Sequence, residues 1–354
     1  MKKNILIASG GSGGHIIPAI AFHDHLKKKF NLFISSDLRG LNYIDPKNYN
    51  LITIATPNVF NNFFLIPFKL IYVLILTIKS IVFLKNKKIN IVLSMGGYPP
   101  TPLCLASISL GIKFYIYEPN LVIGRSNKFF LRYCTKIFCN KKKIKNFPNK
   151  YKKKIFLLNP LVRKIFYKSK PKKNKRFRLM IIGGSQGAKI FDEYLHKIIS
   201  KISKKKQLEI FHQTKNKNIK YLKAFYNKNK IRNKVFDFDK RIIDLIKSCD
   251  FCITRAGAST LAELFILKIP FLAIPLPSAK DNHQYENARY YKDKNCSWVL
   301  DEKKINENIL QKLLNDIILK KNDFLKKKKF INNSNKIIRW KNQNSILTKE
   351  FNED

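Results

Sequence analysis

Acidic residues are scarce in this sequence, and its cysteines form no framework. The 354 residues include 23 Asp and Glu against 70 Lys and Arg, which gives a formal net charge of +47. Among six cysteines, Cys249 and Cys252 form a CxxC with no second pair or flanking His, so we expect buried thiols and no zinc site or disulfide scaffold. No long apolar segment precedes the first glycine-rich turn, which argues against a signal peptide. The composition is typical of a reduced, cytoplasmic protein.

The excess of positive charge has two interpretations. Such a balance is the electrostatic signature of a partner made of nucleic acid or anionic membrane. However, lysine, asparagine and isoleucine crowd the surface stretches together, as a codon bias toward A and T would produce, and the lysines are dispersed. We therefore favour compositional drift over a nucleic-acid groove. In either case we expect attraction to anionic membrane lipids, at about 1 kcal/mol per basic residue near the surface.

Two glycine-rich turns, residues 10–15 and 183–188, each stand between a short apolar strand and a helical stretch. This arrangement aims backbone N–H groups and the positive end of a helix at one spot, which suits a phosphate. The chain is long enough for two domains, and its 45% hydrophobic content can fill two cores. We expect an α/β protein with two Rossmann-like, doubly wound parallel-sheet domains that face each other across a cleft.

Apolar strand candidates alternate with helical patterns in both halves. The expected strands are residues 4–8, 32–35, 89–94, 113–117, 136–139, 179–182, 208–212, 234–238, 250–254 and 270–274. We place the domains at residues 1–160 and 161–335, followed by a helical tail at 336–354 that packs back on the N-terminal domain, with Trp340 as its anchor.

Residues 65–84 form an apolar stretch about as long as the ~20 residues of a membrane-spanning helix. At helical spacing Lys69, Thr77, Lys79 and Ser80 lie on one narrow polar stripe. A buried helix of the first domain would show a similar pattern. The wide apolar arc and its lysines favour a helix that lies in the bilayer interface over one that spans it.

Several separated motifs, taken in chain order, resemble the MurG family of N-acetylglucosaminyltransferases, which have the GT-B fold. The motifs are GGSGGHIIPA at residues 10–19, SMGGY at 94–98, GGSQGA at 183–188, RAGASTLAE at 255–263 and KDNHQYENA at 280–288. The similarity runs from residue 4 to about residue 300.

The resemblance implies an inverting transfer of GlcNAc from UDP-GlcNAc to the 4-hydroxyl of MurNAc in lipid I, which gives lipid II. This reaction belongs to peptidoglycan synthesis, and with it to cell shape and cell division. Residues 1–160 would accept the lipid-linked substrate and residues 161–335 would hold the sugar nucleotide. It also implies a peripheral protein on the cytoplasmic face of the bacterial inner membrane, no tightly bound cofactor, no metal, no nucleic acid, and partners among cell-wall synthesis proteins.

The resemblance also assigns residue roles. His15 would be the general base, because imidazole titrates near neutral pH, and Glu118 would orient the acceptor or His15. A structural histidine at the helix start is the alternative, and His23 and His25 lie further along the same helix. The acceptor side would include Gly96, Gly97, Tyr98 and Asn127. The residues assigned to UDP-GlcNAc are Ser12, Gly13, Gly14, Asn120, Arg163, Ser185, Asp239, Ala258, Ser259, Thr260, Leu261, Ala262, Glu263 and Gln284.

Two acidic positions have competing interpretations. Glu263 would accept the ribose hydroxyls, although Thr260 and Glu263 also have the spacing of a helix capping box. The sequence Asp237-Phe238-Asp239 ends the strand expected at residues 234–238, where two acids would share one face. We prefer a uracil-contacting strand end there to a metal site.

The sequence also departs from the family pattern. It reads YEPN at residues 117–120 where the family has HEQN, NPLVR at 159–163 for NPVR, and HQTK at 212–215 for HQTG, and His283 replaces the first glutamine of a pair. These changes are typical of erosion in a fast-drifting lineage.

Two other functions remain open. A nicotinamide-dependent oxidoreductase shares the strand, glycine turn and helix, and Asp37 lies near the position of its ribose-binding acid, but the first turn lacks the G-x-G-x-x-G spacing. A nucleic-acid-binding protein needs clustered Arg and aromatic platforms on one face. The aromatic residues here group instead with the apolar stretch, namely Phe60, Phe63, Phe64, Phe68 and Tyr72.

Overall fold

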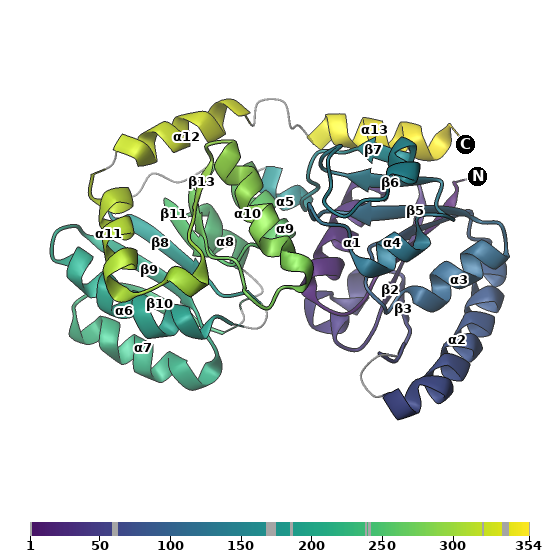
Figure 1. The fold of residues 1–354 in the computed structure, drawn as a ribbon, viewed down its shortest axis with the longest axis horizontal. Coiled ribbons are helices and arrows are strands. Elements are labelled where there is room, and N and C mark those ends of the chain that lie inside the picture. Colours follow the sequence, from purple (N-terminus) through teal and green to yellow (C-terminus); the bar gives the residue numbers. More distant parts are fainter. Residues whose placement is uncertain are drawn as a thin grey trace. The chain divides into compact units, whose positions relative to one another are not determined.

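The computed structural model consists of two compact α/β units, Met1–Lys164 with Arg339–Asp354, and Ile165–Ile338 (Figure 1). The residues that the structure describes are 2–58, 63–167, 175–184, 187–237, 239, 242–320, 322–334 and 340–353. Each unit has a single parallel sheet with helices on its faces, so the expected α/β class with two parallel-sheet domains is confirmed.

The first unit contains a seven-stranded sheet in the order β3-β2-β1-β4-β5-β6-β7, in which every neighbouring pair is parallel. Its strands are β1 Asn4–Ala8, β2 Asn31–Ser36, β3 Leu51–Thr53, β4 Ile91–Ser94, β5 Lys113–Glu118, β6 Lys136–Cys139 and β7 Ile155–Leu157. Its helices are α1 Gly13–Leu26, α2 Ile66–Asn86, α3 Thr101–Ser109, α4 Arg125–Phe130 and α13 Trp340–Asn352. The strand order reverses between β1 and β4, and ligands of open α/β sheets bind at the carboxyl ends of strands beside such a point.

The second unit repeats this plan with six parallel strands in the order β10-β9-β8-β11-β12-β13. Its strands are β8 Phe177–Ile182, β9 Leu208–Gln213, β10 Arg232–Phe236, β11 Phe251–Thr254, β12 Phe271–Ala273 and β13 Ser297–Val299. Its helices are α5 Lys164–Tyr167, α6 Lys189–Ser203, α7 Asn216–Lys228, α8 Ile242–Lys247, α9 Ala258–Ile266, α10 His283–Asp293, α11 Glu307–Ile318 and α12 Asn322–Ser334. The order reverses between β8 and β11.

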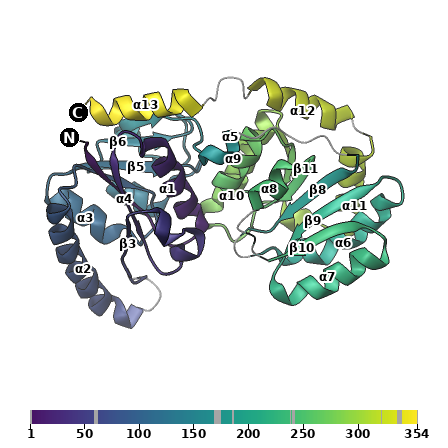
Figure 2. The same ribbon diagram turned by 180° about the vertical axis from the view of Figure 1, so that it is seen from behind.

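The last helix, α13, packs on the first unit (Figures 1 and 2). Leu347 and Phe351 belong to the same buried cluster as the apolar face of α1. Trp340 stacks on His25 with ring centroids 3.7 Å apart, and Lys136 forms an ion pair with Glu350 at 2.7 Å. Aromatic packing and a buried carboxylate therefore hold the end of the chain against the first sheet.

Helix α2 has an unusual distribution of side chains. Its inner face buries Val73, Thr77, Ser80 and Leu84 beside α3, and the two hydroxyls donate to carbonyls of their own helix, to Val73 O at 2.8 Å and Leu76 O at 2.7 Å. Most of its other apolar residues face outward. Among the described residues it is the one helix long and apolar enough to cross a membrane, and 17% of its apolar window is buried. The interpretation as a buried core helix is therefore wrong.

The six cysteines are all buried and free. Burial raises the pKa of the Cys134 thiol to about 11 and that of Cys104 to about 12, so these thiols stay protonated near neutral pH. The expectation that Cys252 is a buried strand cysteine is confirmed, since it lies in β11 with no exposed surface.

Candidate functional site

His15 is the third residue of α1 and lies beside the carboxyl end of β4. Its Nδ1 is 2.8 Å from the carbonyl oxygen of Met95. A carbonyl can only accept, so Nδ1 carries the proton and Nε2 of the neutral ring holds the lone pair. Nε2 points at Gly97, where a Cβ atom would lie 3.0 Å from it. The ring is thus oriented as a proton acceptor on the side of the residue 94–98 turn.

The other two histidines of α1 lie in different surroundings. Burial lowers the pKa of His23 to about 4 and that of His25 to about 4. The His25 ring also stacks on Trp340 and hydrogen-bonds with the side chain of Asn344. Ser12 is the N-cap of α1 and makes no side-chain capping bond, and Gly13 and Gly14 form the first turn. Of the three histidines, His15 is the one at the strand ends that bear the glycine turns.

The first glycine turn is tied to Asp37, which follows β2 directly. Its Oδ1 accepts from Gly11 N at 2.6 Å and Gly40 N at 3.0 Å, and its Oδ2 pairs with Arg39 at 2.8 Å. Burial alone would raise the pKa of this carboxyl, but the hydrogen bonds and Arg39 outweigh it and hold the pKa below its usual value. The carboxylate is therefore fully engaged, and the interpretation of Asp37 as a ribose-binding acid of an oxidoreductase is wrong.

The turn after β4 brings the expected acceptor residues together. Gly96 and Gly97 both have φ of +79°, a left-handed conformation that favours glycine. A Cβ at Gly96 would lie 2.9 Å from the amide oxygen of Asn127, so the buried Asn127 side chain packs directly against this turn. Tyr98 contacts Arg39 through its hydroxyl and its ring. His15, Gly96, Gly97, Tyr98 and Asn127 thus form one group at the carboxyl ends of β1, β4 and β5.

Glu118, the last residue of β5, is buried and organises the loop that follows. Its Oε1 accepts from the backbone N of Asn120 at 3.1 Å and from Asn120 Nδ2 at 2.9 Å. Its Oε2 accepts from Gly124 N at 2.8 Å and from Asn127 Nδ2 at 2.9 Å. Four donors therefore fix this carboxylate, which supports the loop of residues 119–127 and, through Asn127, the turn beside His15.

Arg163 lies elsewhere in the first unit. The backbone N of the next residue, Lys164, donates to Asp24 of α1 at 3.3 Å, and the charge of Arg163 acts on Tyr49. Asp24 is nine residues beyond His15, about 13 Å along the helix axis. The first unit therefore does not bring Arg163 to the group around His15.

The second glycine turn joins β8 to α6. A Cβ at Gly183 would lie 2.6 Å from Ala188 N, and Gly187, with φ of +70°, donates its N–H to Gly184 O at 3.0 Å. Ser185, which the sequence assigns to the diphosphate, lies outside the described residues. Helix α6 begins at Lys189 without a side-chain cap. The described part of this turn is a tight loop whose helix end is open to an anion.

Helix α9 corrects the capping interpretation of Glu263. Its N-cap is Gly257, so Thr260 is the third helical residue and is not a cap. Ser259, Thr260 and Glu263 share one face at the start of the helix, with Glu263 buried and the other two half-buried. Ala258, the first helical residue, lies at the open helix end. Leu261 is fully buried, its N–H donates to Gly257 O at 3.0 Å, and Ala262 is buried beside it.

Gln284 connects two of the turns at the carboxyl edge of the second sheet. Its Oε1 accepts from Ala256 N at 3.2 Å and from Leu276 N at 3.0 Å. These bonds fix the orientation of the carboxamide, and its Nε2 makes no hydrogen bond with the described residues. The NH₂ end is therefore the end that a ligand can use.

The acids at residues 237 and 239 follow the strand and are not part of it, because β10 ends at Phe236. The expected strand end at residue 238 is therefore wrong, and Phe238 lies outside the described residues. Asp239 forms an ion pair with Lys234 at 2.7 Å. Within the described part of the chain, no group of three His, Cys, Asp or Glu side chains could hold a metal ion.

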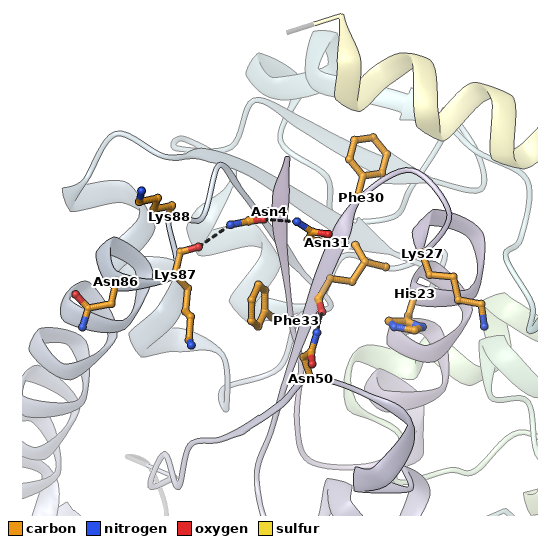
Figure 3. A pocket seen from close by; sticks show the side chains of 11 residues that line it. Asn4, His23, Lys27, Phe30, Asn31, Phe33, Asn50, Asn86, Lys87 and Lys88 are labelled. Atoms are coloured by element: carbon orange, nitrogen blue, oxygen red, sulfur yellow. Dashed lines mark hydrogen bonds between the residues drawn. The ribbon is translucent and has the colours of Figure 1, made fainter. Parts of the chain in front are cut away.

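A hollow in the first unit lies at the opposite edge of the sheet (Figure 3). Asn4 and Asn31 open β1 and β2, and the Asn4 side chain bridges Lys87 O at 2.7 Å and Asn31 Nδ2 at 3.0 Å. The hollow is lined by Asn4, His23, Lys27, Phe30, Asn31, Leu32, Phe33, Asn50, Asn86, Lys87 and Lys88. Because these residues lie at the amino ends of the strands, the hollow is separate from the glycine turns.

Sequence reasoning missed one buried polar network beside the second glycine turn. Asp192 of α6 accepts from Thr214 Oγ1 at 2.6 Å and Asn218 Nδ2 at 2.7 Å, and its Oδ1 lies 3.2 Å from Nε2 of the fully buried His212. Tyr226 lies 3.0 Å from the other ring nitrogen of His212. His212 belongs to the HQTK sequence that the motif comparison singled out. Its acidic partner, Asp192, lies in α6, and no sequence motif marks that position.

Comparisons with known proteins agree with this geometry. Residues 5–139 match the glycosyltransferase family 28 N-terminal domain, and residues 178–340 match the C-terminal domain of the same family. The chain is 43% identical over its whole length to the full UDP-N-acetylglucosamine--N-acetylmuramyl-(pentapeptide) pyrophosphoryl-undecaprenol N-acetylglucosamine transferase of Pelagibacter ubique. It is 36% identical to the protein of the same name from Rickettsia canadensis, over 90% of this chain and 91% of that protein.

A solved structure has the same fold. The crystal structure of Acinetobacter baumannii MurG superimposes with a TM-score of 0.75, at 23% identity, over 99% of this chain and 100% of that one. The likeness therefore extends over both parallel-sheet units, and the relatives are matched along nearly their full length. The chain belongs to the MurG family of glycosyltransferases, within glycosyltransferase family 28.

Proposed function

We propose that this protein transfers GlcNAc from UDP-GlcNAc to the 4-hydroxyl of MurNAc in undecaprenyl-pyrophosphoryl-MurNAc-pentapeptide, which is lipid I, to give lipid II. The observation that carries the proposal is the 43% identity along the whole of both chains to a relative named for this transfer. The first unit takes the lipid-linked acceptor and the second takes the sugar nucleotide.

His15 is the general base of this proposal. The acceptor 4-hydroxyl oxygen attacks the anomeric carbon of GlcNAc, the bond from that carbon to UDP breaks, and UDP leaves with the electron pair. The hydroxyl proton passes to Nε2, the ring nitrogen that the Met95 carbonyl leaves unprotonated. A single displacement of this kind inverts the anomeric carbon.

Glu118 is a positioning residue in this scheme. Its carboxylate is saturated by donors of its own loop, so it acts on the acceptor through Asn120 and Asn127. Pro119 provides no backbone donor, and Glu118 holds the backbone N–H groups of Asn120 and Gly124 in this loop. The turn at Gly96 and Gly97 then presents backbone without side chains beside His15.

The second unit supplies fixed dipoles for the donor. Backbone N–H groups of the second glycine turn and the open end of α6 would stabilise the negative charge that grows on departing UDP, as preorganised donors do. Glu263 would accept from the ribose hydroxyls, and Gln284 would offer its NH₂ group to the sugar. With these groups the reaction needs no metal ion and no tightly bound cofactor.

Helix α2 is the proposed membrane-contacting element, at the cytoplasmic face of the inner membrane. Its outward apolar side chains form a face wide enough to enter the headgroup and acyl boundary, while Thr77 and Ser80 of its polar stripe pack inside the unit. Because α3 covers the inner face, the helix lies along the membrane and does not span it. Anionic lipids complement the net charge of +47.

One assay tests the reaction: incorporation of radiolabelled GlcNAc from UDP-GlcNAc into a lipid I analogue, with and without EDTA. We expect transfer in both conditions. The His15→Ala variant should lose at least about 100-fold in turnover, the ordinary contribution of a general base, and keep its UDP affinity. Absence of transfer by the unaltered protein would overturn the proposal, and full turnover by His15→Ala would remove His15 from the base role.

A further inference from the structure

Lys215 lies against the second glycine turn. It follows β9 and is the N-cap residue of α7. Its Cγ and Cε atoms are each 3.3 Å, and its Cδ atom 3.8 Å, from the position that a Cβ would take on Gly187. The aliphatic stem therefore runs beside Gly187 in the space that a side chain would fill, and the ammonium nitrogen is one bond beyond Cε.

The backbone of Lys215 is held firmly in this place. The preceding residue, Thr214, donates its N–H to Phe236 O at 2.8 Å and its hydroxyl to Asp192 at 2.6 Å. Asn218 donates its backbone N–H to Lys215 O at 2.9 Å and its side chain to Asp192 at 2.7 Å. Asp192 is itself in the first turn of α6, so one carboxylate fixes Lys215 relative to the helix that follows the glycine turn.

The ammonium group of Lys215 has no acidic partner among the described residues. The side chain is exposed, and it forms no hydrogen bond or ion pair with a described residue. The nearby Asp192 carboxylate is already taken by Thr214, Asn218 and His212. An unpaired ammonium beside a glycine turn and an open helix end meets the chemistry of a phosphate oxygen, which lysine binds as a point charge.

We propose that Lys215 binds the diphosphate of the sugar-nucleotide donor, an inference that rests on the proposed function. The family pattern has glycine at this position, and here the stem of lysine covers the turn and adds a full positive charge to its backbone N–H groups. Lys215 is then a donor-binding residue particular to this chain, and its contact is with phosphate and not with uracil or ribose.

The test is titration of the full chain with UDP, UMP and uridine. Lys215→Met keeps the stem and removes the charge, and we expect a 5- to 10-fold loss of UDP affinity with no change for uridine. Lys215→Arg should recover most of the loss. Lys223→Met, which removes an exposed lysine two turns along α7, should bind UDP as the unaltered protein does. In the transfer assay the KM for UDP-GlcNAc should rise while the KM for the acceptor stays constant.

Two results would overturn the inference alone: unchanged UDP affinity in Lys215→Met, or an equal loss for UDP and uridine, which would mean that the lysine acts through the fold. If the unaltered protein binds none of the three compounds, the proposed function fails and this inference with it. The two failures are therefore distinguishable within one titration series.

Discussion

At the scale of single residues, the position of Glu263 in α9 makes a clear prediction. The N-cap of the helix is Gly257, so Glu263 has no capping duty, and its buried carboxylate lies on the same face as Ser259 and Thr260. Replacement by Gln should weaken UDP and uridine binding alike, by about 10-fold or more, because a hydrogen bond to a charged group contributes about 1.5–3 kcal/mol and both compounds carry the ribose.

Isothermal titration checks this prediction, with Asp293→Asn as the control at an exposed acid of α10. Uridine affinity equal to that of the unaltered protein would assign Glu263 a structural role. This pattern also differs from the one expected at Lys215, where UDP alone is affected. The two variants therefore separate the ribose end of the donor from its diphosphate end.

The residues that sequence reasoning could not place are those whose partners are distant in the chain. The motif at residues 10–19 identifies His15, but the carbonyl that fixes its tautomer belongs to Met95, 80 positions away. Likewise Asp37 follows β2 where a ribose-binding acid would stand, and its bond from Gly11, 26 positions away, shows that it instead supports the first glycine turn. Residue type and spacing indicate a role, whereas hydrogen-bond partners decide whether the side chain is available.

At the scale of elements, the central strands were predictable and the edges were not. Strands β1 and β6 have the bounds predicted from the sequence, because the apolar residues after the first position of each are buried on both faces. The edge strands β3, β7 and β13 have three residues each and are partly exposed, so each is too short for its sequence pattern to identify it as a strand. The missed strands therefore alter the width of each sheet and leave its order around the glycine turns unchanged.

Helix α2 yields a prediction about membranes. Ile71, Leu74 and Ile78 are 57%, 60% and 55% exposed, so replacing all three with Ser removes apolar surface without opening a cavity. We expect loss of sedimentation with vesicles that contain anionic lipid and no fall in thermal stability. The control replaces exposed apolar residues of the second unit, Ile309 and Leu325, with Ser. Vesicle binding equal to that of the unaltered protein would remove α2 from the membrane role.

The docking of α13 on α1 should depend on pH. Burial lowers the pKa of His25 from 6.5 to about 4 in the folded protein. Between these two pH values the imidazole is therefore protonated in the unfolded chain and neutral in the folded one. Stability is therefore complete above pH 6.5 and is lost as the pH falls toward 4, by up to about 3 kcal/mol. Denaturation of the unaltered protein and of His25→Gln between pH 7.5 and pH 4.5 measures the difference, which should shrink at low pH.

Trp340 offers an independent readout of the same contact. In a Trp298→Phe background it is the one remaining tryptophan, and its emission should change as the stacked His25 acquires charge. A titration with a midpoint near pH 6.5 would contradict the prediction, because it would show that burial does not lower the pKa of His25.

At the scale of the whole molecule, the net charge of +47 and the apolar face of α2 make different contributions to surface binding. At physiological ionic strength the Debye length is about 8 Å, so attraction to dispersed exposed lysines is largely screened, whereas burial of apolar surface is not. Added salt should therefore weaken binding to anionic vesicles without abolishing it.

The same argument separates membrane from nucleic acid. Binding to RNA would rest on phosphate contacts alone, and its affinity falls steeply with salt, by about 10³ to 10⁵ between 50 and 200 mM for six to ten contacts. We expect RNA to be released by salt that leaves the protein on vesicles, and UDP binding to proceed with or without RNA. Retention of RNA at 200 mM salt in the presence of UDP would indicate a dedicated groove, because dispersed lysines cannot hold a polyanion once their charges are screened.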